Sequence, residues 1–317
     1  MAVYVNTNYS ALQGQRYLGN VQNQLTTTYQ RLSSGMRINS AKDDAAGLQI
    51  ADRLTSQING LNQGNRNASD GIALAQTMEA GMDEVSGMLQ KIRTLAVQAN
   101  NGTNTAEDRT AISKEMSSLA TEVNRIAMKT TFAGKTVLNG QTKQGSIFGD
   151  NAGAAGNDLH GAEGTMTLQV GSNKGDTISF KMTSIMFSVV GTGDLIKNAD
   201  AVFKTGADGS ITVDLNKADP AAAGKTLGDV ITLMDSMIAV VDGKRADLGA
   251  IQNRLESSIR NQSNVAANEA DARSRIRDAD FAEESANLTQ QNIIQQAASS
   301  MLMQANTRPQ LGLSLLG

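Results

Sequence analysis

The chain has 317 residues, a net charge of −3, 19% charged and 3% aromatic residues, and no cysteine. This composition excludes disulfides and thiolate chemistry, and it gives no field strong enough to attract nucleic acid or an anionic membrane. No apolar run approaches the roughly 20 residues of a membrane-spanning helix. Residues 1–19 lack the basic segment and apolar core of a secretory signal peptide, so we expect any export to proceed without a cleaved signal.

The N-terminal segment is almost free of charge but keeps an apolar stripe at helical spacing. Residues 1–30 contain one charged side chain, Arg16. Surface helices normally carry charges on their outer face, so the segment is either a disordered polar tail or a helix covered by other copies. Its small residues bury little area, which predicts a helix that becomes ordered on assembly. The stripe comprises Ala11, Gly14, Leu18, Val21, Leu25, Thr28 and Leu32.

A polar cluster in "RLSSGMRINSAKDDAAGLQIADRL" (31–54) follows this segment and could be an active-site loop or a joint. Gly35 suits the left-handed position after a helix. Ser40 is predicted to cap the next helix, with Asp43 as the carboxylate of a capping box. Asp43 and Asp44 are then expected in the first turn, where the helix dipole favours negative charge. Because each polar residue has a structural role, the cluster indicates a joint.

Long apolar seams with a period of three and four residues come next, and they return near the C-terminus. Only Pro220 and Pro309 interrupt the chain, so long helices are permitted. Seams of this length predict coiled-coil packing, with polar Arg245 and Gln252 on the same track. The seam positions are Met82, Val85, Leu89, Ile92, Ala96, Ala99, Ile112, Met116, Leu119, Val123 and Ile126, then Leu227, Ile231, Met234, Ile238, Val241, Leu248, Leu255 and Ile259.

The middle of the chain, residues 141–224, is rich in Gly, Asn, Asp and Thr. The alternating segment 165–182 predicts a β-hairpin that turns at 172–175, and 210–215 predicts another strand. The helices at both ends must therefore pair while the middle protrudes. We predict a mainly α chain, a long antiparallel helical bundle or coiled coil formed by paired N- and C-terminal segments, with a small β-hairpin-containing middle region.

The C-terminal segment repeats the composition of the N-terminal one. Residues 285–317 contain one charged side chain, Arg308. The segment carries an apolar stripe of Ile294, Ala298, Met301 and Ala305, with Leu302 alongside. Both ends are therefore expected to pack against other copies of the chain.

Motifs for catalysis fail on inspection, so we expect no catalytic, cofactor or metal site and no enzyme activity. "AGKT" occurs at 133–136 and 223–226, but Lys129 and Asp219 stand where a phosphate loop needs its first glycine. His160 is the only histidine, which excludes an HExxH zinc site and a Ser-His-Asp triad. The acidic residues of 278–285 lie beside Arg273, Arg275 and Arg277, which favours ion pairing over metal binding.

Several long blocks of the sequence resemble bacterial flagellin, the filament subunit of the flagellum. In the first half they are "VNTNYSALQGQRYL", residues 31–80, "QKIRTLAVQANNGTN" and "EVNRIAMKTTFAGKTVLNG". In the second half they are "DGKRADLGAIQNRLESSI", "ARSRIRDADFAEESANLTQQNIIQQAASSMLMQAN" and "QLGLSLLG". The match covers about residues 1–140 and 225–317.

The resemblance implies a subunit that self-assembles into the extracellular filament for swimming motility, with termini that fold on polymerisation. Residues 1–44 and 282–317 would form the inner helical domain. Residues 45–183, with the hairpin, and 225–281 would form the rod-like domain, and 184–224 a short variable outer segment. The implied self-assembly residues are Leu18, Val21, Leu25, Leu32, Ile294, Ala298, Met301 and Leu302.

The resemblance also implies partners. An export chaperone would hold about residues 280–317. The other implied partners are the type III flagellar export apparatus and the hook-associated and cap proteins. A host innate immune receptor would contact Gln90, Lys91, Arg93, Leu95, Gln98 and Glu115. The family pattern has Arg at position 91 and Glu at 94, where this chain has Lys91 and Thr94, and Lys cannot reproduce the planar fork of Arg. Leu311, Leu313, Leu315 and Leu316 resemble the segment read by cytosolic sensors. Assembly contacts are the expected primary role of these residues.

Two alternatives remain. A hook–filament junction protein of the same export system shares the terminal architecture, but the continuous blocks at 31–76 and 273–305 favour flagellin. A secreted enzyme or effector could use flagellin-like ends for export. The short middle segment and the single histidine argue against this second alternative.

Overall fold

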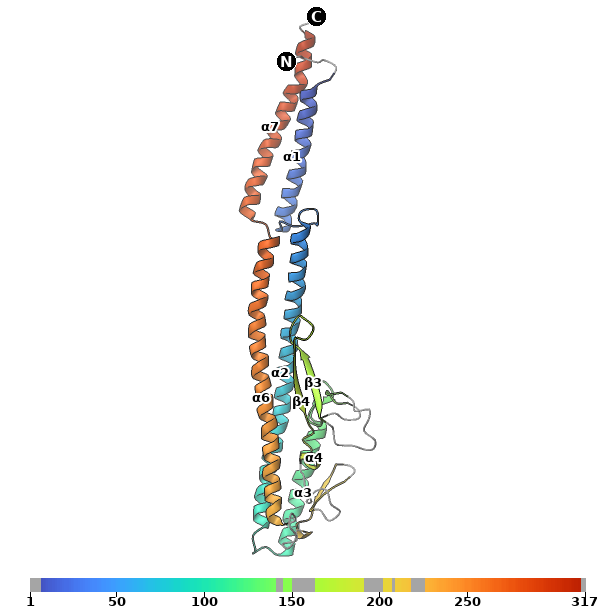
Figure 1. The fold of residues 1–317 in the computed structure, drawn as a ribbon, viewed down its shortest axis with the longest axis vertical. Coiled ribbons are helices and arrows are strands. Elements are labelled where there is room, and N and C mark those ends of the chain that lie inside the picture. Colours follow the sequence, from blue (N-terminus) through green and yellow to red (C-terminus); the bar gives the residue numbers. More distant parts are fainter. Residues whose placement is uncertain are drawn as a thin grey trace. The chain divides into compact units, whose positions relative to one another are not determined.

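The computed structural model describes residues 7–140, 145–149, 163–190, 202–206, 209–217 and 226–314, with side chains up to residue 307. Long helices dominate it: α1 (Tyr9–Ser34), α2 (Ala45–Ala99), α3 (Ala106–Lys129), α6 (Leu227–Arg277) and α7 (Phe281–Ser314) (Figure 1). The short helices are α4 (Phe187–Val190) and the 3-10 helix η1 (Leu215–Lys217). Within these ranges no helix is long and apolar enough to cross a membrane. The predicted mainly α fold class is confirmed.

The strands form three small antiparallel pairs in the middle of the chain. They are β1 (Thr131–Phe132) with β2 (Lys135–Thr136), β3 (Gly164–Gln169) with β4 (Thr177–Met182), and β5 (Phe203–Thr205) with β6 (Ile211–Val213). The pair β3–β4 is the predicted hairpin, with Gly164 opposite Met182 and Gln169 opposite Thr177. The strand expected within 210–215 is β6.

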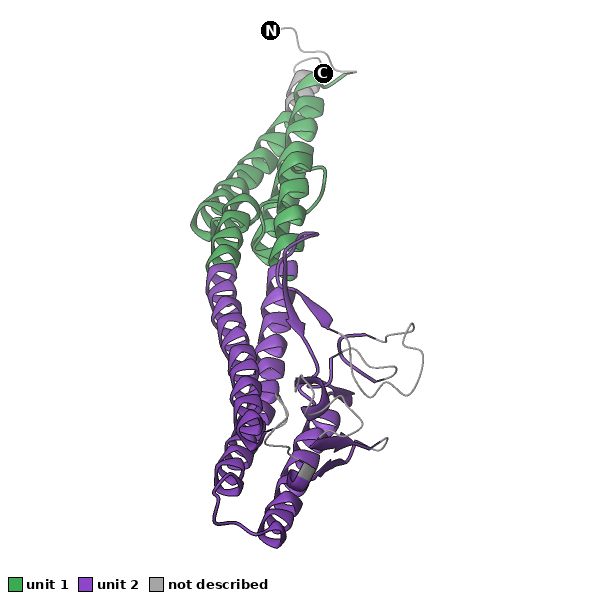
Figure 2. Cartoon of the chain, turned by 60° about the horizontal axis from the view of Figure 1, so that its bottom comes forward, with its two compact units in different colours: residues 1–59, 264–317 green, residues 60–263 purple. Residues whose placement is uncertain are grey.

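The chain forms two compact units, residues 1–59 with 264–317 and residues 60–263 (Figure 2). The boundary falls inside α2 and α6, so each of these helices contributes to both units. The bounds of the inner, rod-like and outer domains that the resemblance implies remain a proposal.

In the first unit, the two joints between helices are hydrogen-bonded to each other. The amides of Arg37 and Ile38 both donate to the carbonyl of Arg277, at 2.7 and 3.3 Å, and the amide of Ala279 donates to the carbonyl of Gly35 at 3.0 Å. Gly35 has a φ of 69°, which confirms the left-handed end of α1. The segments after α1 and before α7 are thereby tied together.

The predicted cap of α2 is wrong. The helix begins at Ala45, and the Asp44 carboxylate accepts a hydrogen bond from the Gly47 amide at 2.9 Å, so Asp44 caps it. The Asp43 carboxylate instead closes the preceding turn, accepting from the amides of Ser40 and Asn39 at 2.9 and 3.1 Å. These backbone bonds, from Ser40 first and Asn39 second, hold the pKa of Asp43 below its ordinary value. Ser40 and Asp43 do bond to each other as a capping box would, but they close the turn before the helix, and Asp44 accepts from the first helical turn instead.

In the second unit, α2 and α6 run antiparallel and are joined by polar contacts in opposite sequence order. Asp83 pairs with Arg245 at 2.9 Å, Glu79 accepts from Gln252 at 2.9 Å, and Arg93 pairs with Asp235. The predicted seam of α2 is fully buried from Met82 to Ala99. The contacts of Arg245 and Gln252 account for the two polar residues on the α6 track.

The predicted α6 seam between 227 and 241 is buried at Met234 and Val241, but at two other positions the buried residue is the one before the predicted residue. Val230 and Met237 are buried, whereas the predicted Ile231 and Ile238 are only partly buried. Helix α6 buries a face wider than a two-helix seam, so both tracks carry apolar residues and periodicity alone does not locate the centre.

Glycines of α2 let the β3–β4 hairpin approach the helix backbone. A Cβ on Gly60 would lie 2.7 Å from the Cβ of Ser172, and one on Gly71 would lie 2.5 Å from Cδ1 of Leu168. A Cβ on Gly64 would overlap the carbonyl oxygen of Val170, which belongs to the backbone and cannot rotate away. The absence of side chains at these glycines therefore allows the hairpin to pack directly against the backbone of α2.

Replacing Gly64 with alanine tests this close contact between α2 and the hairpin. Gly87, on the same helix, has open space where a Cβ would lie, so Gly87→Ala should stabilise the chain by about 0.5–1 kcal/mol through helix propensity. Gly64→Ala should instead lower the free energy of unfolding by about 1–3 kcal/mol, the usual cost of overpacking. Urea unfolding followed by circular dichroism measures both variants. Equal stabilisation by the two substitutions would contradict the close hairpin contact.

Helix α3 supplies side chains that bond the backbone of β6, which among the described residues pairs with β5 alone. The amides of Leu215, Val213 and Ile211 donate to the hydroxyls of Ser113, Ser117 and Thr121 at 3.2, 2.8 and 3.0 Å. The donors are alternate residues that run from β6 into η1, and the acceptors are four residues apart on α3. The two spacings are close because two strand residues span roughly 6.6 Å and four helical residues roughly 6.0 Å.

Asn124 ends this series of contacts in the core. Its Oδ1 accepts from the Phe187 amide at 2.8 Å, and its Nδ2 donates to the Gly209 carbonyl at 2.7 Å. The side chain is fully buried. One amide therefore satisfies two backbone groups from two different segments, and it attaches both to α3.

Asn124→Ala should destabilise the second unit by about 2–5 kcal/mol, because a buried N–H and a buried carbonyl both lose their partners. Ser118→Ala is the matched control, since Ser118 lies exposed on the same helix and bonds only the Lys114 carbonyl. Urea midpoints should fall for the first variant and stay unchanged for the second. An unchanged midpoint for Asn124→Ala would show that the two backbone groups find other partners.

Candidate assembly surface

Helices α1 and α7 run antiparallel beside each other in the first unit, and three polar contacts fix their register (Figure 1). Asn8 caps α1 and donates from Nδ2 to the Ala305 carbonyl at 2.8 Å. Thr28 donates to Oε1 of Gln291 at 3.1 Å. Arg31 pairs with Glu284 at 3.1 Å.

The seam between these helices buries little apolar surface. On α1 only Val21, Leu25 and Thr28 are buried, and Leu18 and Leu32 are partly buried. On α7 Glu284 is buried, and the remaining seam residues are partly buried: Leu288, Gln291, Gln295, Ala298, Leu302 and Ala305. Leu302 packs over Gly14, where a Cβ would lie 3.3 Å from its Cδ1. Small and polar residues thus hold a pair that gains little from the hydrophobic effect.

The structure separates the predicted C-terminal stripe into two groups. Ala298 and Leu302 lie in the seam, whereas Ile294 and Met301 are 37% and 68% exposed. Gln291 and Gln295 occupy seam positions instead. Because these two residues are polar, a search for apolar periodicity shifts to the neighbouring track of the helix.

The Arg31–Glu284 pair sits in the part of the seam nearest the joints. The Glu284 side chain is 9% exposed and the Arg31 side chain 31%. Nε of Arg31 is buried without a hydrogen-bond partner. Desolvation offsets much of the attraction in such a pair, so its main effect is to specify the register.

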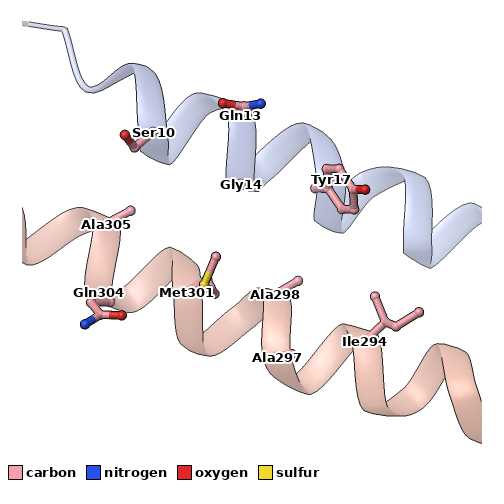
Figure 3. Close-up of a pocket in the computed structure, with 10 residues that line it drawn as sticks. All are labelled: Ser10, Gln13, Gly14, Tyr17, Ile294, Ala297, Ala298, Met301, Gln304 and Ala305. Atoms are coloured by element: carbon pink, nitrogen blue, oxygen red, sulfur yellow. The ribbon is translucent and has the colours of Figure 1, made fainter. Parts of the chain in front are cut away.

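A groove of about 720 Å³ runs along one side of the helix pair (Figure 3). The figure shows the side chains of Ile294, Ala298 and Met301 pointing from α7 in the direction of α1. None of the lining residues is charged. They are Ser10, Gln13, Gly14 and Tyr17 from α1 and Ile294, Ala297, Ala298, Met301, Gln304 and Ala305 from α7.

The outer faces of both helices expose large apolar side chains. Helix α7 carries no charged side chain from residue 285 to residue 307. Isolated exposed apolar residues are ordinary, but so many on one helix pair make this surface a candidate for contact with another molecule. The exposed residues are Tyr9, Leu12, Tyr17 and Tyr29 on α1 and Phe281, Ile293, Met301 and Met303 on α7.

The residues implied as an immune-receptor contact lie in the second unit. Lys91 on α2 pairs with Glu115 on α3 at 3.1 Å, and Nη2 of Arg93 donates to Asp235 on α6 at 3.2 Å. The hydrogen bond to Asp235 raises the pKa of Arg93. Leu95 is buried, whereas Gln90, Lys91, Arg93, Gln98 and Glu115 are exposed. The structure therefore gathers four charged groups into two ion pairs, and it leaves their recognition by a receptor as a proposal.

Other residues singled out from the sequence cannot be placed. His160 and the last leucines, Leu315 and Leu316, lie outside the described residues, as do the side chains of Leu311 and Leu313. Within the described ranges, no three His, Cys, Asp or Glu side chains gather as metal ligands would.

Comparison with known proteins decides the family. A model of the bacterial flagellin N-terminal helical region matches residues 5–143, and a model of the C-terminal helical region matches residues 231–316. The chain is 37% identical to flagellin D of Vibrio anguillarum and to flagellin A of Vibrio cholerae, over the full length of each protein. The chain belongs to the bacterial flagellin family. This flagellin is accordingly a structural subunit of the flagellar filament, an extracellular assembly.

A solved structure shares its fold with this flagellin at lower identity. The putative flagellar hook-associated protein from Vibrio parahaemolyticus is 18% identical, with a TM-score of 0.55 over 74% of this chain and 100% of that chain. This likeness shows the fold alone. The identity over full length is to flagellins, which supports the filament subunit over the junction protein.

Proposed function

We propose that this flagellin polymerises through the outer faces of α1 and α7, and that the terminal segments become fully ordered only when neighbouring subunits cover them. The observation that carries the proposal is the uncharged groove beside a thin helix pair. Lost chain entropy costs roughly 1–2 kcal/mol per ordered residue, and so thin a seam offsets only part of it. Contacts with other copies supply the remainder.

The self-assembly residues then divide into two roles. Leu18, Val21, Leu25 and Leu32 of α1, with Ala298 and Leu302 of α7, hold the pair together. Ile294 and Met301 line the groove and stay exposed in it, so they are available to a neighbouring subunit. In this scheme residues 1–44 and 282–317 form the inner domain, 45–183 and 225–281 the rod, and 184–224 the outer segment.

The partner proposals follow from the same surfaces. An export chaperone would cover Phe281 and Ile293, which are exposed on α7, until the type III export apparatus takes the chain. Hook-associated and cap proteins would meet the filament ends. An innate immune receptor would contact the exposed residues around the Lys91–Glu115 pair, with Lys91 weakening the contact.

Seeded polymerisation tests the assembly surface. Full-length protein, and a version lacking residues 1–44 and 282–317, would be mixed with sheared filaments, pelleted and imaged by electron microscopy. Only the full-length chain should elongate the seeds. Growth of the truncated chain would contradict assembly through the termini.

Ile294→Asp should block this elongation, because an unpaired charge would be buried at the groove. Ile294→Leu, the matched control, keeps an apolar side chain of equal size and should elongate normally. Since Ile294 is 37% exposed in the subunit, both variants should keep the unfolding transition of residues 60–263. Wild-type elongation by Ile294→Asp would overturn the proposed role of the groove.

A further inference from the structure

The methionines of this flagellin fall into two classes of exposure. The sequence has 14 methionines and no cysteine, so thioethers are its only reduced sulfur. Among the described residues, only Met301 and Met303 are exposed, at 68% and 65%. The other described methionines are partly buried or are packed in the core of the second unit: Met78, Met82, Met116, Met182, Met186, Met234 and Met237.

Met301 and Met303 differ in where they point. Met301 lines the groove beside α1, as Figure 3 shows, and Met303 is not among the lining residues. Residues two apart on a helix do not share a face, so one exposed thioether belongs to the groove and the other does not. The chain therefore contains a matched pair of equally accessible methionines.

We propose that Met301 is an oxidation-sensitive modification site whose sulfoxide prevents subunits from adding to the filament. The reagent class is the hydroperoxides, including hydrogen peroxide. The consequence for growth rests on the proposed function, because it requires that the groove be covered by a neighbouring subunit. Susceptibility itself rests only on exposure, which governs methionine oxidation in folded proteins.

The chemical step is a two-electron oxygen transfer. A sulfur lone pair of Met301 attacks the terminal oxygen of the peroxide, the S–O bond forms and the O–O bond breaks. The proton of the transferred hydroxyl group passes to the leaving oxygen, which departs as water from hydrogen peroxide and as an alcohol from an organic hydroperoxide, and the sulfoxide remains on Met301. Sulfur is oxidised by two electrons and the peroxide is reduced by two.

The sulfoxide changes the character of the groove. Next to Met301 on α7, the lining residues Ile294, Ala298 and Ala305 have side chains that cannot donate a hydrogen bond to the new oxygen, whereas the donors of the groove are Ser10, Gln13, Tyr17 and Gln304. A neighbouring subunit that packs apolar side chains over Met301 would separate this oxygen from water, and the contact is disfavoured unless one of those donors reaches it. Met303 lies outside the groove, so its sulfoxide leaves the groove unchanged.

The first experiment maps the oxidised sites. Subunits and completed filaments would be exposed to a pulse of hydrogen peroxide, digested and analysed by mass spectrometry. In subunits Met301 and Met303 should oxidise at least about tenfold faster than the core methionines. In filaments Met301 should be protected by a similar factor. Equal rates for exposed and core methionines would overturn the site assignment, and an unprotected Met301 in filaments would overturn the covered groove.

The second experiment separates the two methionines by function. Met301→Leu and Met303→Leu replace each thioether with an apolar side chain of similar volume, so both untreated variants should elongate seeds. After peroxide, wild type and Met303→Leu should lose at least about nine-tenths of their elongation rate, because one blocked groove prevents addition. Met301→Leu should keep its rate.

The outcomes distinguish this inference from the proposed function. Loss of growth by oxidised Met301→Leu, or protection by Met303→Leu, would overturn the role of Met301. Failure of untreated wild type to elongate matched seeds would overturn the proposed assembly surface, whatever the mass spectra show. Met301→Gln, which places a permanent amide in the groove, should elongate slowly without peroxide, whereas Met303→Gln should elongate normally.

Discussion

The thin seam between α1 and α7 is the constraint on which the rest of this flagellin depends. Its centre on α1 is Val21, Leu25 and Thr28, and on α7 it uses glutamines, alanines and two leucines, one of which packs over Gly14. A helix pair of this kind buries little apolar surface and is therefore only marginally stable by itself. Its exposed side chains include several large apolar residues and few charges, Arg16 and Glu283 among them. Under the proposed function, contacts with other copies complete the pair, and a weak seam makes its order depend on assembly.

The second unit follows the opposite rule. Helices α2, α3 and α6 enclose a continuous core of leucines, valines, methionines and phenylalanines, in which Phe187 and Phe203 pack with ring centres 5.0 Å apart. Polar residues here act as connectors. The hydroxyls of α3 satisfy the edge of β6, and Asn124 attaches two further segments. In both units, then, apolar contact supplies the attraction and a few directional hydrogen bonds determine which register is formed.

The sequence predicted those features that depend on local chemistry or on long periodicity. The left-handed end of α1 followed from Gly35, and the hairpin followed from the alternation of apolar and polar residues. The α2 seam followed from apolar residues spaced three and four apart, and these are buried. The cap at Asp44 was missed because Ser40 and Asp43 have the spacing of a capping box, although they close the preceding turn. The seam of α7 was displaced because Gln291 and Gln295 occupy it, and polar residues give no apolar signal. The contacts of α3 with β6 and the close packing of the hairpin on the glycines of α2 were also missed, since each joins segments far apart in the chain.

The charged residues of the implied receptor contact already have partners within the subunit. Lys91, Arg93 and Glu115 are already engaged in ion pairs, and Leu95 packs into the core. A partner at this surface would exchange existing pairs rather than meet free charges. Exposed pairs contribute little to stability, so their exchange is easy, and the geometry of the new contacts decides affinity. Arg93 keeps a planar fork for such a contact, whereas Lys91 offers a single ammonium. The same side chains therefore join α2 to α3 and α6 first, and recognition by another molecule depends on what those helices leave accessible.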